Sequence, residues 1–204
     1  MTNLAITQTR EWVSSVIVKY NFCPFARKEV ENNCIHYELS PAVKIDDAVM
    51  DMLEQCTQLD QNPERETTLI LFDKGFSDFE DFLDLVDLAN ALLVAQGFEG
   101  KYQIANFHPD YVFADSNEDD AANYTNRAPY PTLHLIRELS MSEALEGYDE
   151  PESIPEHNIK LARRKGIDFW QQLLEGIKNR AHNRSVFKYQ IQCYFLTQLP
   201  FTST

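Results

Sequence analysis

The chain has 204 residues, of which 44% are hydrophobic, and it carries a formal net charge of −14. That length and apolar content are typical of a single domain with one substantial core. The acidic charge disfavours nucleic acid and anionic membranes as partners, and no apolar run is long enough to cross a bilayer. The N-terminus lacks the pattern of a secretory signal, so we expect a cytoplasmic protein.

The first third of the chain predicts helices alternating with strands. Apolar residues at helical spacing predict a helix over residues 4–20, which Pro24 ends because the residue before a proline avoids the helical conformation. A short strand is predicted over 34–39 and a second helix over 45–59. Residues 67–72, TTLILF, are continuously apolar and β-branched, which is typical of a strand covered on both faces.

The middle of the chain contains the clearest helix signal and the longest loop. Ser77 and Glu80 form a capping box that begins a helix, and Gly97 ends it. Residues 102–107 predict a strand, and the loop of about twenty residues after it is rich in aromatic residues and prolines. Loops of that length in compact domains are usually functional or disordered, and this composition favours an ordered, functional loop.

The last elements are a strand over residues 131–138, a short helix with a capping box at Ser140 that ends near Gly147, and a helix over 157–178. Together the elements predict an α/β (α+β) fold, in which one mixed sheet of about four strands carries packed helices. We expect residues 1–180 to form this single domain. Residues 181–204 would be a C-terminal tail, either extended or added as an edge strand.

Three clusters of residues near the predicted ends of elements could support chemistry. In the first, Cys23 precedes a proline and lies close to Arg27 and Lys28, and cationic neighbours can lower a thiol pKa toward reactivity. The alternative is a plain buried cysteine at a corner between a helix and a strand. The four cysteines include no CxxC pair, which predicts neither a zinc ribbon nor a dithiol redox centre.

The second cluster follows the strand over residues 102–107 and includes His108, Asp110 and Tyr111. Asp110 could orient His108 for proton transfer, or both could bind a metal together with His134. The alternative is a turn in which Asp110 caps backbone amides and His108 only packs.

The third cluster is the run NYTNRAPYPTLHLIRE, which begins at Asn123. Arg127 and Arg137 are the residues most suited to hold an anion, with Asn126 beside them. Strand alternation divides the residues of its second half into two sets, Thr132, His134 and Ile136 on one face and Leu133, Leu135 and Arg137 on the other.

The motifs N-x-CPFA, FHPDYxFA and NYTNRAPYPTLHLIRE, followed by IPEHN, occur in this order along the chain. With them, about residues 8–175 resemble the bacterial domain-of-unknown-function family 1415. The resemblance does not indicate which activity or which cofactor the protein has. It marks the residues that fall on the family motifs, namely Asn21, Cys23, Pro24, Phe25, His108, Pro109, Asp110, Tyr111, Asn123, Tyr124, Asn126, Arg127, Pro129, Pro131, His134 and Arg137.

The first functional hypothesis is an enzyme acting on an anionic small molecule, with the three clusters converging at one edge of the sheet. Its catalytic residues would be Cys23, His108 and Asp110. Its ligand-binding residues would be Arg27, Tyr111, Asn123, Tyr124, Asn126, Arg127, His134 and Arg137. The alternatives are a non-catalytic module that binds a ligand or a protein, and motifs that form a purely structural lock between loops. The sequence identifies no cofactor, no set of metal ligands and no oligomeric state.

Overall fold

The computed structural model describes residues 3–146 and 148–179. Its centre is one mixed sheet of four strands in the order β1-β2-β4-β3. The strands are β1 (Ile35–Ser40), β2 (Thr67–Phe72), β3 (Tyr102–Phe107) and β4 (Thr132–Arg137). β1 and β2 are parallel, whereas β4 is antiparallel to both of its neighbours. The predicted α+β fold with a single mixed sheet is therefore confirmed.

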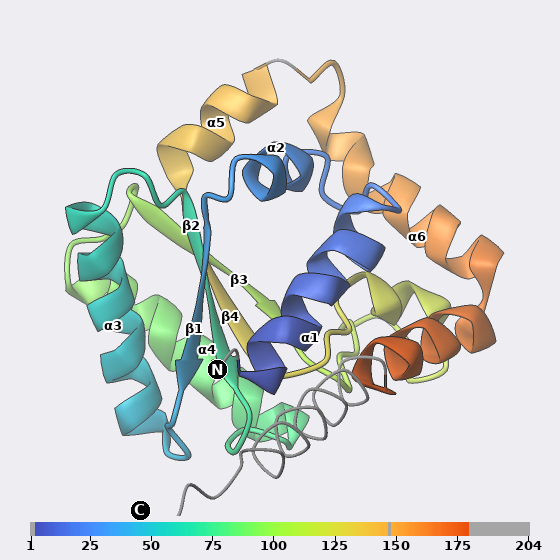
Figure 1. The fold of residues 1–204 in the computed structure, drawn as a ribbon, viewed down its shortest axis with the longest axis horizontal. Coiled ribbons are helices and arrows are strands. Elements are labelled where there is room, and N and C mark those ends of the chain that lie inside the picture. The colour runs from blue at the N-terminus through green and yellow to red at the C-terminus, as the bar shows by residue number, and fades with distance from the viewer. Residues whose placement is uncertain (1–2, 147, 180–204) are drawn as a thin grey trace, which may run out of the picture.

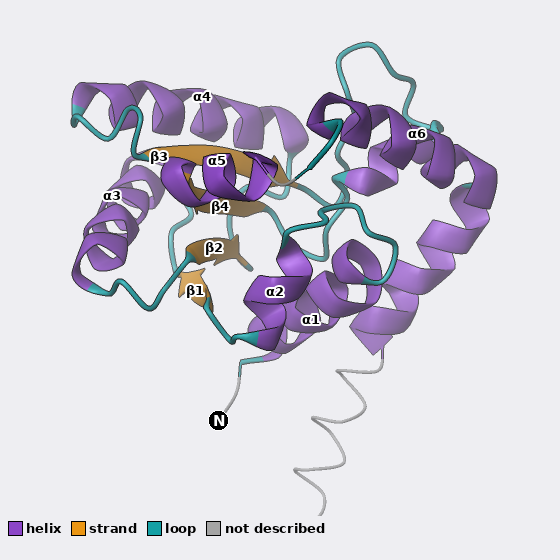
Figure 2. Cartoon of the chain, turned by 90° about the horizontal axis from the view of Figure 1, so that it is seen from above, coloured by secondary structure: helices purple, strands orange, loops and turns teal. Residues whose placement is uncertain are grey.

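Helices cover both faces of this sheet (Figures 1 and 2). They are α1 (Leu4–Trp12) with a π-helical continuation (Val13–Val18), α2 (Ala26–Glu31), α3 (Ile45–Gln61), α4 (Phe79–Ala95), α5 (Glu138–Glu146), α6 (Ile154–Lys165) and a helix over 167–179, with short 3₁₀ turns at Ala121–Thr125 and Pro151–Ser153. α3 and α4 lie on one side of the sheet, and α1, α2 and α6 lie on the other (Figure 2). No helix in the described ranges is long and apolar enough to cross a membrane.

The sheet divides the interior into two hydrophobic cores. One lies against α3 and α4 and includes Met52, Ile70 and Leu133, which are completely buried. The other lies against α1 and α6 and includes Trp12, Leu69 and Trp170. All six residues of β2 are buried, because both cores need its side chains, which confirms the prediction of a strand covered on both faces.

The helix boundaries correct several sequence predictions. The first predicted helix changes to π-helical geometry at Val13, and the short helix α2 was not predicted at all. The cap of α4 is Asp78 instead of Ser77, since the Asp78 side chain accepts hydrogen bonds from the amides of Glu80 and Asp81. α5 begins directly after β4 at Glu138, with no cap at Ser140.

The helix predicted over 157–178 is in fact two helices. α6 ends at Lys165, and Gly166 adopts a φ of 83°, a left-handed conformation that glycine adopts at little cost. A second helix follows over residues 167–179. The predicted end near Gly147 and the predicted tail over 181–204 lie outside the described residues.

Candidate functional site

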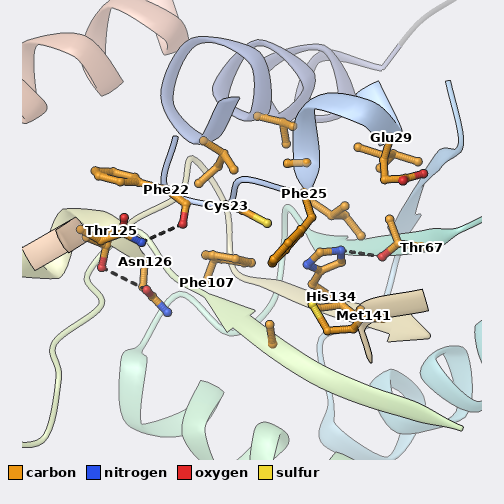
Figure 3. Close-up of a pocket in the computed structure, with 18 of the residues that line it drawn as sticks. Phe22, Cys23, Phe25, Glu29, Thr67, Phe107, Thr125, Asn126, His134 and Met141 are labelled. Atoms are coloured by element: carbon orange, nitrogen blue, oxygen red, sulfur yellow. Dashed lines mark hydrogen bonds between the residues drawn. The ribbon is translucent and has the colours of Figure 1, made fainter. Parts of the chain in front are cut away.

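A cavity of about 490 Å³ lies on the face of the sheet opposite α3 and α4. Its floor comes from all four strands, and its walls come from α1 with its π-helical continuation, α2, α5 and α6. Most of the lining is apolar, including Trp12, Phe25 and Phe107. The polar and titratable residues that line it are Cys23, Glu29, Glu66, Thr67, Thr125, Asn126, His134, Ser140 and Asn158. Figure 3 shows many of these side chains around the cavity.

His134 reaches this cavity because it alternates with the core residues of β4. Leu133 and Leu135 belong to the core beneath α3 and α4, whereas His134 and Ile136 line the cavity, as the strand pattern predicted. Sequence reasoning thus placed His134 on the correct face.

The hydrogen bonds of Thr67 settle the proton position on His134. The Thr67 hydroxyl donates to the carbonyl oxygen of Leu135. A hydroxyl has a single proton to donate, so its 2.6 Å contact with Nε2 of His134 requires the ring to be the donor. The proton of the neutral ring is therefore on Nε2, and Nδ1 is a bare acceptor. Burial lowers the pKa of His134 to about 4, so the ring is neutral at physiological pH.

Cys23 also lines the cavity, but its environment differs from the one we predicted. Burial raises the pKa of its thiol, and this outweighs the backbone hydrogen bonds of Phe25 and Ala26, which favour the thiolate. Arg27 is exposed, and its guanidinium donates to the carbonyl oxygen of Val18 at 3.5 Å. The expectation that cationic neighbours lower the thiol pKa was therefore wrong, because desolvation dominates.

Two glutamates are the charged side chains among the residues that line the cavity. Burial raises the pKa of Glu29, and repulsion from the Glu66 carboxylate raises it further, with a smaller opposing effect from Lys28. Atom Oε1 of Glu66 is buried and has no hydrogen-bond partner. Neither glutamate was predicted as a site residue, because single acids near the ends of elements usually face solvent.

Two asparagines lie at the other end of the cavity. Asn126 donates to the carbonyl oxygen of Asn106 at 3.3 Å and accepts from the Thr125 hydroxyl. Asn158 of α6 is only 8% exposed, and its Nδ2 donates to the carbonyl oxygen of Phe22 at 2.7 Å. Its Oδ1 is buried without a partner. Asn158 belongs to the IPEHN motif, so the motif could have identified it as a candidate.

His108 and Asp110 lie away from the cavity lining. His108 is fully buried against Phe79 and Phe82 of α4. Its Nε2 donates to the carbonyl oxygen of Phe76 at 2.9 Å, and its Nδ1 accepts from the amide of Asp110 at 3.0 Å. Both ring nitrogens are thus occupied. The alternative turn is matched only in part, because His108 packs here but the Asp110 backbone amide, and not its carboxylate, makes the hydrogen bond. With both ring nitrogens of His108 bonded inside the protein, this geometry does not pair His108 with the Asp110 carboxylate for proton transfer.

The loop between β3 and β4 is held together by Asn123 and Arg127. Asn123 is completely buried, accepts from the amide of Phe113 and donates to the carbonyl oxygen of Asn117. The Arg127 guanidinium donates to the carbonyl oxygens of Tyr111 and Glu118. It also lies 4.7 Å from the centre of the Tyr124 ring. We call this hydrogen-bonded network within the loop the loop lock; Tyr111 and Arg127 also line a second pocket beside α4, with Asp110.

The other side chains that we predicted to bind a ligand also have partners within the protein. Arg137 lies at the opposite end of β4 and donates to the carbonyl oxygens of Leu59 and Arg65. The Tyr111 ring packs against the rings of Phe79 and Phe113. Of the three predicted clusters, the cavity therefore unites Cys23, Asn126 and His134 and leaves out the arginines. In the described part of the chain, no three His, Cys, Asp or Glu residues are arranged to hold a metal ion.

A family model with the description "Protein of unknown function (DUF1415)" matches residues 4–172. The chain belongs to this family. The resemblance carried by the motifs is thus confirmed over most of the chain. Neither the search of curated proteins nor the search of solved structures finds a match.

Proposed function

We propose that this protein is cytoplasmic and that it binds a small molecule with a mainly apolar body in the cavity beside His134. One observation carries the proposal: an apolar cavity of about 490 Å³ is lined by two residues, Glu66 and Asn158, that each have a buried oxygen with no hydrogen-bond partner. Small-molecule sites commonly have volumes of about 300–1,000 Å³ and combine an apolar lining with a few fixed polar groups. The cysteines Cys23, Cys34 and Cys56 are free thiols, and free thiols are typical of the reducing cytoplasm, which supports the proposed cellular location.

The placement of the arginines changes the expected ligand. Arg127 and Arg137, which we expected to hold an anion, donate to backbone carbonyl groups outside the cavity. The charged residues that line the cavity are Glu29 and Glu66. An anion in this cavity would be repelled by both carboxylates and would find no cation there. The geometry supports a neutral or cationic ligand over the anionic one.

The test fills the cavity with a side chain. Ala144 of α5 lines the cavity, whereas Glu143 beside it is exposed, so Ala144→Trp and Glu143→Trp are a matched pair. We expect the neutral apolar dye N-phenylnaphthylamine to fluoresce with the wild type and with Glu143→Trp, and to lose this signal with Ala144→Trp. Equal dye binding by Ala144→Trp and the wild type would refute the proposal.

A second candidate is catalysis by Cys23 in the same cavity, favoured by the shared position of Cys23 and His134 on its lining. The electrostatics oppose it: burial raises the pKa of the thiol and lowers that of the imidazole to about 4. Such a ring is too weak a base to ionise such a thiol. Measuring the rate of Cys23 alkylation by iodoacetamide against pH, with Cys34→Ser, Cys56→Ser and Cys193→Ser in the background, isolates this thiol. A thiol pKa below that of free cysteine would favour a nucleophilic role for Cys23, and a pKa above it would exclude Cys23 as the nucleophile at neutral pH.

A further inference from the structure

We propose that the ligand of this cavity is an amine, with an ammonium group at the end lined by Glu29 and Glu66 and an apolar body along the aromatic walls. At its far end the molecule would carry a hydroxyl or amide N–H that donates to Asn158. This inference names the ligand class and rests on the proposed binding function. It starts from the two ends of the cavity.

The glutamate end presents two negative groups that lack a fixed partner. Glu29 of α2 and Glu66, which immediately precedes β2, are close enough for their charges to repel each other. A buried oxygen of Glu66 accepts no hydrogen bond. An unpaired buried acceptor on a charged group is costly, and a cation that donates N–H groups would remove both the repulsion and the missing hydrogen bond.

The opposite end presents a neutral acceptor. Asn158 is more than nine-tenths buried, its Nδ2 is held by the carbonyl oxygen of Phe22, and its Oδ1 has no partner. Figure 3 shows Phe22 with Thr125 and Asn126 at one end of the cavity and Glu29 with Thr67 at the other. Because an amide oxygen cannot compensate a buried charge, a neutral hydroxyl or N–H suits this end better than a second ammonium group.

Between these ends the lining is apolar or neutral. Phe25 and Phe107 lie along the cavity, and His134 carries no charge because burial lowers its pKa to about 4. No lysine or arginine of the described residues lines the cavity. The charge pattern of the cavity therefore selects for the head group, while its apolar lining accepts the body of the molecule.

Calorimetric titration with three probes of equal chain length tests the head group. At pH 7 we expect n-octylamine to bind roughly tenfold more tightly than 1-octanol or octanoate, as for a hydrogen bond to a charged partner. The double variant Glu29→Gln/Glu66→Gln should bind octylamine no better than octanol. Glu31→Gln, an exposed change on the same helix, should retain the preference.

The far end is tested by adding one donor to the same amine. We expect 8-amino-1-octanol to bind the wild type roughly threefold more tightly than octylamine. In Asn158→Leu this difference between the two ligands should vanish, and the comparison within one variant cancels any change in its stability.

The outcomes separate the two proposals. If octanol or octanoate binds as tightly as octylamine while N-phenylnaphthylamine still distinguishes wild type from Ala144→Trp, the amine assignment is wrong and the binding function stands. If the dye fails to distinguish them, the binding function itself is wrong. A preference for amines that survives the double glutamate change also overturns the assignment.

Discussion

The two faces of the sheet carry helices that pack to different degrees. On one face, α3 buries six residues and α4 buries five, including Met52 and Phe82, which are fully inaccessible. On the other face, the short helices α2 and α5 bury no residue at all, although both line the cavity. A helix without a buried stripe cannot close the space over the sheet. The cavity therefore exists where the covering helices are short and weakly apolar.

Two histidines show the same contrast on the scale of single side chains. His108 lies in the closely packed region beneath α4, and both of its ring nitrogens are hydrogen-bonded. His134 faces the cavity and uses only Nε2. Burial lowers the pKa of both rings. A lowered pKa alone therefore does not distinguish a structural histidine from one in a candidate site, whereas the hydrogen-bond pattern does.

The largest expected effect compares methionines on the two faces. Met52 is fully buried beneath α3, whereas Met141 of α5 lines the cavity. We expect Met52→Ala to lower the free energy of unfolding by about 3 kcal/mol and Met141→Ala by less than about 1 kcal/mol, because only the first creates a new void in a closed core. Urea unfolding measures both values. Equal losses would mean that the two faces are packed alike.

The next effect is a pH dependence that originates on the cavity face. The folded-state pKa of His134, about 4, lies below its ordinary value of 6.5, so its neutral form stabilises the fold above that ordinary value. This contribution is lost as the pH falls through about 4. His134→Gln retains an N–H donor for Thr67 but cannot titrate. Between pH 7 and pH 4 we expect its free energy of unfolding to fall by about 1–3 kcal/mol less than that of the wild type. Unfolding measured between pH 7 and pH 4 gives the difference, and identical pH profiles would contradict the buried neutral ring.

Arg127 tests whether the loop lock is separate from the cavity. A lysine keeps the charge but cannot form both hydrogen bonds of the guanidinium, to Tyr111 and Glu118. We expect Arg127→Lys to lower the free energy of unfolding by about 1 kcal/mol and to leave the affinity for N-phenylnaphthylamine unchanged. The exposed Arg164→Lys serves as the control. A selective loss of ligand affinity in Arg127→Lys would instead return this residue to the site.

The smallest effect concerns the glutamate end of the cavity. Because burial and Glu66 raise the pKa of Glu29, its ionised form opposes folding once the pH rises through that raised value. We expect Glu29→Gln to increase the free energy of unfolding by about 0.5 kcal/mol at pH 7, a small value because solvent screens a half-exposed group. Below the ordinary glutamate pKa the two proteins should be equally stable. A destabilised Glu29→Gln at pH 7 would show that the carboxylate has a partner.

Several parts of the fold and of the site could be predicted from local sequence. Strand β2 was recognisable because its residues must satisfy two cores at once, and His134 was assigned to the correct face by strand alternation alone. Helix α2 was missed because its six residues bury nothing and thus carry no apolar period. The arginines were misjudged because their charge suggested an anion site, while their actual partners are backbone carbonyl groups, within the same loop for Arg127 and far away in sequence for Arg137.

The sequence by itself determined the strands, the two-sided burial of β2 and the family, because periodic apolar residues and contiguous motifs are local properties. Only the tertiary structure decided which motif residues meet. It brought Cys23, Asn126 and His134 to one cavity with Glu29, Glu66 and Asn158, and it directed His108 and Arg127 into internal contacts. The reason is physical: burial and hydrogen-bond partners depend on segments distant in the chain, and these set the pKa of a thiol or an imidazole.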